Sequence, residues 1–289
     1  MEHSSASNAI EMRSSCRYNT LKMWAKPIII INAISATTPS KSVNRSAPQT
    51  DTVRLAKRVA DQLGCSRAEA TQYIEGGWIR VDGVMSELAG ARVAAAQNVS
   101  LQDGATLAPI EPVTILFHKS AGVTDAEIGD PQSGLICSAT RQEAGRSERD
   151  FLQRHTRDLT MTSWLGSDAA GLVVLTQDYR IIRKLVDDAN RIEHELVVEV
   201  VGTMKDGGIA LLQNHASWNG KPLNSLKVSW QSEHRLRFAL KGLQVEMIKH
   251  LCAQVGLDAL SIKRIRIGRI SLASLPAGQW RYLANYERF

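Results

Sequence analysis

The chain has 289 residues, of which 44% are hydrophobic and 22% charged, and it carries a formal net charge of +6. This composition is typical of a soluble globular protein with a sizeable core, and no apolar stretch reaches the length of a transmembrane helix. The isoelectric point of about 9.2 favours a polyanion such as nucleic acid as a partner, although many soluble proteins with this charge bind none.

The four cysteines lie far apart and form no ligand pattern with histidine, which predicts reduced thiols, no metal site and a cytoplasmic protein. Residues 1–50 are rich in Ser, Thr and Asn and sustain no amphipathic period, so they are predicted to be a disordered tail. Lys22 and Lys26 precede a short apolar run, which leaves a targeting signal as the less favoured alternative for this segment. No association with a membrane is expected.

Residues 51–110 are predicted to form the first folded domain. The helical spacing of Leu55, Val59 and Leu63 gives an apolar face to a helix that ends at Gly64. A second helix begins with the Ser-x-x-Glu pattern of a capping box, and a short strand with an Asp-Gly hairpin turn follows it. This order of elements predicts a small α+β domain.

Within this domain, the segment RLAKRVADQLGCSRAEATQYIEGGWIRVDG resembles the RNA-binding domain first described in small-subunit ribosomal protein S-four. The resemblance rests on the Arg-Leu opening, the Ser-Arg at the second helix, and a glycine followed by a V-x-V/N-G strand. It implies a domain that binds structured RNA mainly through shape and phosphate contacts. The alternative is a small module whose charges are merely solvated. Carried over by position, the expected RNA contacts are Arg54, Lys57, Arg58, Ser66, Arg67 and Arg80.

Residues 111–289 are predicted to form a second domain in which strands outnumber helices. Val113–Phe117 is a predicted strand and Val245–Val255 a predicted helix. The segment 124–150 is rich in Gly, Ser and charge and is predicted to be a long surface loop. Hairpin signals separate most of the other strands, so we expect an α+β fold with a mixed, largely antiparallel sheet.

Three segments of the second domain resemble motifs of the RsuA-type pseudouridine synthases, which modify ribosomal RNA. They are HKSAG from His118, SWLGSDAAGLVVLTQD from Ser163, and RIRIGRISLASLPAGQWRYL from Arg264. Together with the first domain, the resemblance covers residues 51–289. It implies isomerisation of uridine to pseudouridine without a cofactor or metal. It also implies that one Asp carboxylate, kept ionised by an Arg, is the essential group.

The residues that carry the chemistry depart from the family pattern. The catalytic Asp belongs five residues before Gly171, where this chain has Gly166, which lacks a side chain. The second Asp of the motif, Asp168, is the candidate replacement, and a turn or cap carboxylate is the alternative interpretation. Leu196 stands where the family has a stacking Tyr, and Lys249 stands for one of two Arg residues. Further departures are His194, Met247, His250 and Leu251.

Because several coupled parts of one site have changed, we expect the protein to bind structured RNA but to form pseudouridine very slowly or not at all. The competing hypotheses are an active pseudouridine synthase on ribosomal RNA and a non-catalytic RNA-binding or ribosome-assembly factor. A DNA-binding regulator is disfavoured because no recognition-helix motif appears.

The second domain is expected to bind RNA through Lys119, Lys249, Arg264 and Arg266. Strand alternation predicts that Arg264 and Arg266 share one face and form part of a basic groove. An exposed edge strand kept soluble by its charge is the alternative. We expect structured RNA, ribosomal RNA in particular, to be bound by a monomer.

Overall fold

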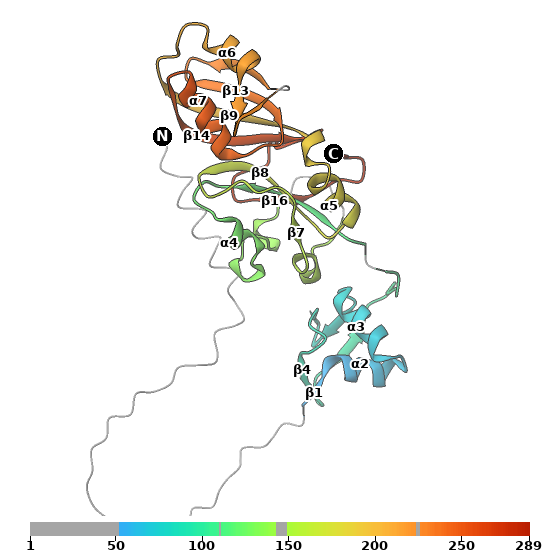
Figure 1. Ribbon diagram of the computed structural model, residues 1–289. Helices are drawn as coiled ribbons and strands as arrows, with labels where there is room; N and C mark the ends of the chain where they lie inside the picture. The colour runs from blue at the N-terminus through green and yellow to red at the C-terminus, as the bar shows by residue number, and fades with distance from the viewer. Residues whose placement is uncertain (1–51, 110, 143–148, 224–225) are drawn as a thin grey trace, which may run out of the picture. The chain divides into compact units, whose positions relative to one another are not determined.

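The computed structural model describes residues 52–109, 111–142, 149–223 and 226–289 (Figure 1). These residues form two compact units, one on each side of residue 110. The predicted disordered tail lies outside the described residues. None of the helices in the described ranges combines the length and the apolar character needed to cross a bilayer.

The first unit consists of two helices and two small antiparallel sheets, in which β1 pairs with β4, and β2 lies between β3 and β5. Its elements are β1 (Thr52–Arg54), α2 (Leu55–Leu63), α3 (Arg67–Glu75), β2 (Ile79–Val81), β3 (Val84–Met85), β4 (Arg92–Ala94) and β5 (Val99–Leu101).

The two helices of the first unit begin and end where local sequence signals predict. Gly64 adopts a left-handed conformation with φ of 64° and terminates α2. Ser66 Oγ accepts a hydrogen bond from Glu69 N at 3.2 Å, and Glu69 Oε2 accepts one from Ser66 N at 2.8 Å, so the predicted capping box is confirmed. The apolar face of α2 is shorter than predicted, because Leu55 is buried but Leu63, in the last turn, is 37% exposed.

The second unit is built on a nine-stranded sheet with the strand order β12-β13-β9-β14-β8-β6-β16, to which β7 and β15 attach. Its strands are β6 (Thr114–Lys119), β7 (Thr160–Met161), β8 (Ala169–Thr176), β9 (Glu193–Gly202), β12 (Lys227–Ser232), β13 (Arg235–Lys241), β14 (Leu257–Ile267), β15 (Ile270–Ser271) and β16 (Trp280–Tyr282), with a separate hairpin of β10 (Ser217–Trp218) and β11 (Lys221–Pro222). Its helices are α4 (Asp125–Gly129), α5 (Tyr179–Val186), α6 (Gly208–His215) and α7 (Val245–Gln254), with 3-10 turns at Pro131–Ser133, Ser138–Thr140, Gln153–Thr156 and Ala189–Arg191.

The prediction of a mixed, largely antiparallel sheet is confirmed, because β14 and β8 form its parallel pair and the other pairings are antiparallel. Gly171 in β8 faces the backbone of Arg264 in β14, and a Cβ at this position would overlap the Arg264 carbonyl oxygen. The glycine on which the motif register rests is therefore required by the close approach of two strands.

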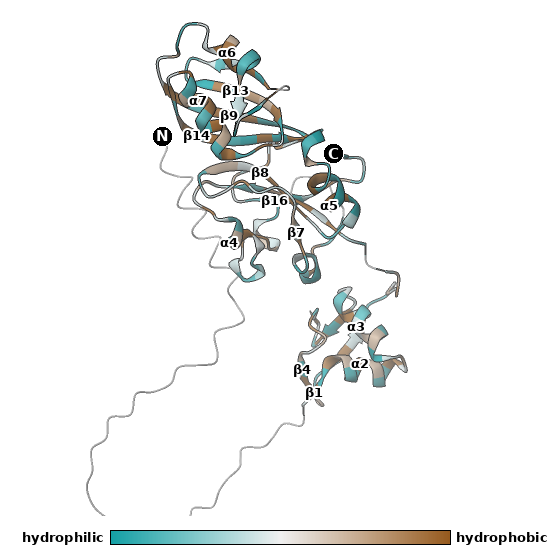
Figure 2. Cartoon of the chain, viewed as in Figure 1, coloured by the Kyte–Doolittle hydropathy of each residue, from teal (hydrophilic) through white to brown (hydrophobic). Residues whose placement is uncertain are grey.

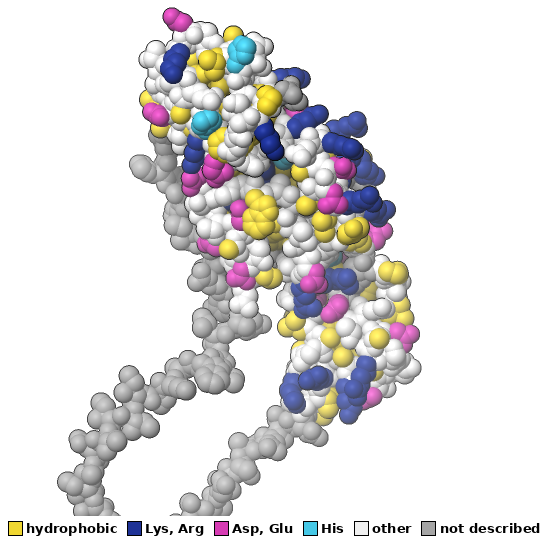
Figure 3. All heavy atoms as spheres, viewed as in Figure 1, with side chains coloured by type: hydrophobic (Ala, Val, Ile, Leu, Met, Phe, Trp, Pro, Cys, Tyr) yellow, Lys and Arg dark blue, Asp and Glu magenta, His cyan; other side chains and the backbone are white. Residues whose placement is uncertain are grey.

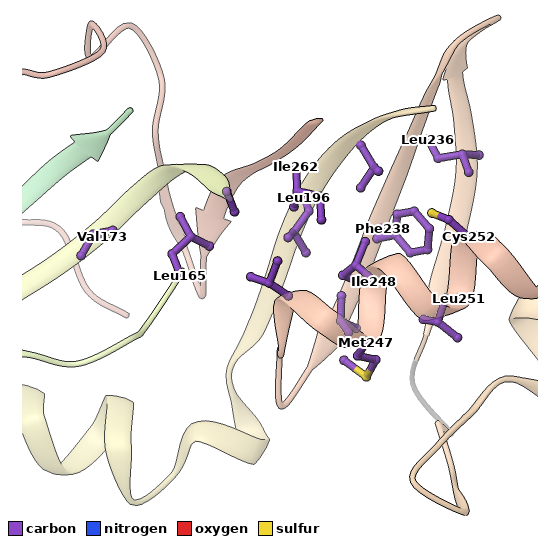
Figure 4. Close-up of a cluster of buried hydrophobic side chains, with 14 of the residues drawn as sticks. Leu165, Val173, Leu196, Leu236, Phe238, Met247, Ile248, Leu251, Cys252 and Ile262 are labelled. Atoms are coloured by element: carbon purple, nitrogen blue, oxygen red, sulfur yellow. The ribbon is translucent and has the colours of Figure 1, made fainter. Parts of the chain in front are cut away.

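The main core of the second unit lies between the sheet and α7. Leu196, Phe238 and Ile262 on three strands pack with Met247 and Ile248 on the helix (Figure 4). From Glu193 to Val200 of β9, partly exposed and buried residues alternate. Figure 2 shows both hydrophobic and hydrophilic residues in this part of the sheet. This alternation fixes which side chains of β9 face the helix.

Residues 124–142, the described residues at the start of the predicted loop, are more ordered than the sequence analysis predicts, since they contain α4 and two 3-10 turns. A second capping box begins α4: Thr124 Oγ1 accepts from Glu127 N at 3.2 Å, and Glu127 Oε2 accepts from Thr124 N at 2.8 Å. The Thr-x-x-Glu pattern is a capping-box signal like the Ser-x-x-Glu pattern that predicts α3, and it places Asp125 at the first position of the helix.

Candidate active-site cleft

A cleft of about 530 Å³ opens in the second unit beside the loop that precedes β8. It is bounded by this loop, by α4, by the end of α5, and by the start of α7. His194 of β9 and Arg264 of β14 also line it. The motif that resembles the catalytic loop of the pseudouridine synthases thus forms one wall, with Ser163, Trp164, Leu165 and Gly166.

Gly166 lines the cleft and leaves unfilled the space that a side chain at this position would occupy. Its φ of 68° lies in the left-handed region, and no atom would come within 4 Å of a Cβ built there. Its backbone N donates a hydrogen bond to Asp125 Oδ2 at 3.1 Å. The position at which the resemblance leads us to expect a carboxylate is therefore open, and a carboxylate from another element contacts its backbone.

Asp168, the replacement carboxylate considered from the sequence, does not line the cleft. Its side chain is 62% exposed and forms an ion pair with Lys249 Nζ at 2.5 Å, while Ser167 Oγ donates to its other oxygen at 3.0 Å. These two hydrogen bonds, that from Lys249 first, lower the pKa of Asp168 below its usual value. The geometry favours a surface carboxylate that fixes α7 to the loop.

Asp125 is the cleft carboxylate that the sequence analysis missed. It is half-buried at the start of α4, and its Oδ1 is screened from solvent without a hydrogen-bond partner among the described residues. A second contact holds the same segments together, because Gly122 N donates to Ser167 O at 2.9 Å. The turn after β6 and the loop before β8 are therefore fixed to each other at the cleft.

Two buried cations lie behind this wall. Arg264 is 1% exposed and donates from Nε to Leu172 O at 2.7 Å and from Nη2 to Ser163 O and Oγ at 3.1 Å. Burial lowers the pKa of Arg264 to about 9, and the charge of Asp125 opposes this shift. Lys119 is fully buried, donates to Ala169 O at 2.6 Å, and has a pKa lowered by burial against the opposing charge of Asp125.

The predicted shared face of Arg264 and Arg266 is wrong. Arg264 pairs across the sheet with Leu196, but a β-bulge follows and Arg266 pairs with Glu195. Leu196 and Glu195 are consecutive in β9 and face opposite sides, so the two arginines do as well. Arg266 instead forms ion pairs with Glu193 at 2.5 Å and Glu195 at 2.8 Å. These contacts help to lower the pKa of Glu195 to about 2.

Two further departures from the family pattern lie at or near the cleft. His194 lines it, and burial lowers the pKa of His194 to about 3, with the charges of Arg264 and Arg266 acting in the same direction. Leu196 is fully buried in the core and does not line the cleft. The aromatic side chain at the cleft is Trp164, which is 70% exposed.

Comparison with known proteins supports the family suggested by these motifs. No family model matches the chain. The dual-specificity RNA pseudouridine synthase RluF of Salmonella typhi is 26% identical over 243 residues, which cover 82% of this chain and 78% of the relative. The ribosomal small subunit pseudouridine synthase A of Vibrio cholerae is 24% identical over 241 residues, covering 81% of this chain and 97% of that protein. Over more than 80% of its length, the chain is therefore similar in sequence to RNA pseudouridine synthases.

The fold of the chain also agrees with a solved structure. A crystal structure of a pseudouridylate synthase superposes with a TM-score of 0.50 at 18% identity, over 80% of this chain and 96% of that chain. Among the described residues, no group of three or more His, Cys, Asp or Glu side chains is arranged to hold a metal ion.

In the first unit, the predicted RNA-contacting residues lie at or near the surface. Arg58 is half-buried, and the other five are exposed: Arg54, Lys57, Ser66, Arg67 and Arg80. Arg92, which the sequence analysis missed, lies opposite Arg54 in the pairing of β1 with β4 and is exposed. The strand pairing brings these two side chains together from distant positions in the chain, a feature that no local pattern indicates.

The second unit carries a further basic surface that the sequence analysis missed. Lys and Arg side chains gather along the side of this unit that carries α5 (Figure 3). Its exposed members on α5 and the following turn are Arg180, Arg183, Lys184 and Arg191. Leu185, Val186 and Ala189 from the same stretch line the cleft, so this basic surface borders it.

Proposed function

We propose that this protein binds structured RNA, ribosomal RNA in particular, and holds a uridine in the cleft beside Gly166. The observation that carries the proposal is the cleft itself, which has the loop of the family motif as one wall and Arg264 behind it. The relative from Vibrio cholerae is named for the small ribosomal subunit and one from Bacillus subtilis for the large subunit.

The first unit supplies part of the RNA-binding surface in this proposal. Its resemblance to the S-four-type domain and its exposed basic residues on β1, α2 and α3 support phosphate contacts. In the second unit, the exposed cations of α5 take the place of Lys119 and Arg264, whose charged groups are buried and bound to backbone carbonyls. We further propose that the protein acts as a monomer in the cytoplasm.

Position 166 supplies no catalytic carboxylate in this proposal. Isomerisation of a bound uridine therefore requires a carboxylate from elsewhere, and Asp168 is directed to Lys249 outside the cleft.

A non-catalytic RNA-binding or ribosome-assembly factor is the second candidate function. It is favoured by Gly166 together with the burial of Leu196, because neither position offers a reactive or stacking group to the cleft. The two functions share an RNA-binding step and differ in the formation of pseudouridine.

The shared step is tested by measuring the affinity of the full chain for ribosomal RNA fragments as salt is varied. The proposal predicts that the logarithm of affinity falls linearly with the logarithm of salt concentration, by about 0.7 to 0.9 for each phosphate contact. Affinity that does not change with salt would rule out binding through the basic surfaces.

A further inference from the structure

We propose that Asp125 is the catalytic carboxylate of this protein and takes the place of the side chain lost at position 166. The inference rests on the proposed function, because it assigns the group that acts on a uridine held in the cleft. It revises the expectation, drawn from the sequence, that pseudouridine formation is very slow or absent.

The placement of Asp125 is the first argument. Its Oδ2 lies 3.1 Å from the backbone N of Gly166, so its carboxyl group reaches the residue whose side chain is missing. The space beside Gly166 is empty, since no atom would come within 4 Å of a Cβ there. Asp125 and Gly166 both line the cleft, although they lie 41 positions apart in the sequence.

The bonding state of Asp125 is the second argument. One oxygen accepts the Gly166 N–H, while Oδ1 has no hydrogen-bond partner among the described residues and is screened from solvent. An unpartnered carboxylate oxygen in such a place is unfavourable unless a bound group satisfies it. The position is set by the capping box of α4 and by the backbone bond from Gly122 to Ser167, so the carboxylate is held by ordered elements.

The charges around Asp125 are the third argument. Arg264 and Lys119 are buried behind the cleft wall, and the charge of Asp125 raises the pKa of both against the effect of burial. The carboxylate therefore lies close enough to both cations to interact with their charges. Arg264 donates to Ser163 and Leu172 and is therefore fixed in the wall.

The other carboxylates near the cleft fit this role less well. Asp168 pairs with Lys249 and does not line the cleft. Glu246 lines it from the first turn of α7, but its side chain is exposed, whereas Asp125 accepts the Gly166 N–H and is half-buried. An exposed carboxylate is solvated by water and is a weaker nucleophile than one screened from it.

The step assigned to Asp125 conserves atoms and electrons. Its carboxylate attacks C1′ of the uridine, the C1′–N1 bond breaks, and the electron pair of that bond leaves on the uracil ring. The uracil anion turns, C5 attacks C1′, and the carboxylate departs with its electron pair. C5 then loses a proton and N1 gains one, so the product is an isomer of the substrate and no oxidant or reductant is needed.

The test uses the full chain in excess over ribosomal RNA transcribed in vitro, which contains no pseudouridine, and counts the pseudouridine formed. Asp125→Asn keeps an acceptor for the Gly166 N–H and is expected to lower the rate by on the order of 10³-fold or more while RNA affinity is unchanged. Asp130→Asn, an exposed carboxylate five positions further along the chain, is the matched control and should retain the wild-type rate.

A rescue variant keeps the test independent of any loss of folding. Gly166→Asp is added to Asp125→Asn, because the empty space at position 166 admits a side chain and aspartate tolerates a positive φ better than most residues. The proposal predicts that the double variant regains activity lost in Asp125→Asn. A fully active Asp125→Asn, or loss of activity in Asp168→Asn or Glu246→Gln instead, would overturn it.

The remaining outcomes separate this inference from the proposed function. A wild-type protein that binds ribosomal RNA but forms no pseudouridine, even in excess, contradicts the role of Asp125 and leaves the RNA-binding function standing. A wild-type protein that does not bind the RNA contradicts the proposed function itself.

Discussion

The cations of the first unit and those behind the cleft occupy motif positions that look alike in the sequence, but their surroundings differ. Arg54 and Arg67 extend into solvent, whereas Arg264 is 1% exposed and donates three hydrogen bonds within the protein. A basic residue in a nucleic-acid-binding protein can thus serve either the partner or the architecture of the site. The role of each cation depends on whether its side chain is buried, and for Arg264 the position in the sheet determines this.

The largest effect is expected where β8 and β14 touch. Gly171→Ala should lower the free energy of unfolding by about 4 kcal/mol or more, because the new Cβ would overlap the Arg264 carbonyl at a φ of 118°. Chemical denaturation measures this loss. Gly220→Ala is the control, since it has a positive φ but open space around it, and should cost about 1 kcal/mol. Equal losses of unfolding free energy in both variants would show that β8 and β14 have room for a Cβ at position 171.

As the pH falls, protonation of His194 in the cleft should lower the free energy of unfolding before protonation of Glu195 affects its ion pairs. The folded pKa of His194 is about 3 against a usual value of 6.5, so the unfolded chain binds the proton first as the pH falls. The contribution of His194 to stability is therefore fully present above pH 6.5 and is lost on the way down to pH 3, by about 1.4 kcal/mol for each pH unit.

The comparison of two histidine variants isolates this effect. His194→Gln should reduce the slope of unfolding free energy against pH between 6.5 and about 5, a window above the range in which Glu195 takes up its proton. Burial also lowers the pKa of His118 and of His155, so their contributions to the slope remain. His250→Gln, on the exposed face of α7, should leave the dependence as it is in the wild type. Identical curves for the wild type and His194→Gln would mean that His194 is hydrated in the folded protein.

The exposed cations should affect RNA binding with little change in stability. Replacing Arg54, Arg58 and Arg67 together by alanine should reduce the salt dependence of RNA affinity by about 2 to 3 logarithmic units per decade of salt. Titration of ribosomal RNA fragments measures this slope. Arg266→Met is the contrasting variant, because Arg266 is paired with Glu193 and Glu195, and it should leave the slope unchanged. An unchanged slope in the triple variant together with a smaller slope in Arg266→Met would show that Arg266, and not the exposed cations of the first unit, contacts the RNA phosphates.

Local patterns predict much of the fold because the signals act over a few residues. The capping box at Ser66 and the stop at Gly64 depend on side-chain and backbone contacts within one turn. The hairpin signals between most strands predict a mixed, largely antiparallel sheet, but they do not predict the order of its strands. Alternation fails at Arg266, because a β-bulge inserts one residue and changes the face of every side chain after it.

The candidate site is predicted only in part. The motif register locates the cleft and shows that position 166 lacks a carboxylate. It cannot show that Asp125 lies beside that position, since the contact joins segments 41 positions apart. The capping box at Thr124 could have placed a helix start there, but a loop rich in glycine and serine was expected instead. The bond between Asp125 and Gly166 depends on tertiary structure, which the local pattern does not contain.

The central claim of this account is that the cleft still holds and converts a uridine although Gly166 has no side chain. Its most direct test is a map of pseudouridines in ribosomal RNA from cells with and without this gene. The account predicts that at least one pseudouridine present with the gene is absent without it, and that the wild-type gene restores it but the Asp125→Asn gene does not. Identical maps with and without the gene, in cells that express the protein, would contradict it.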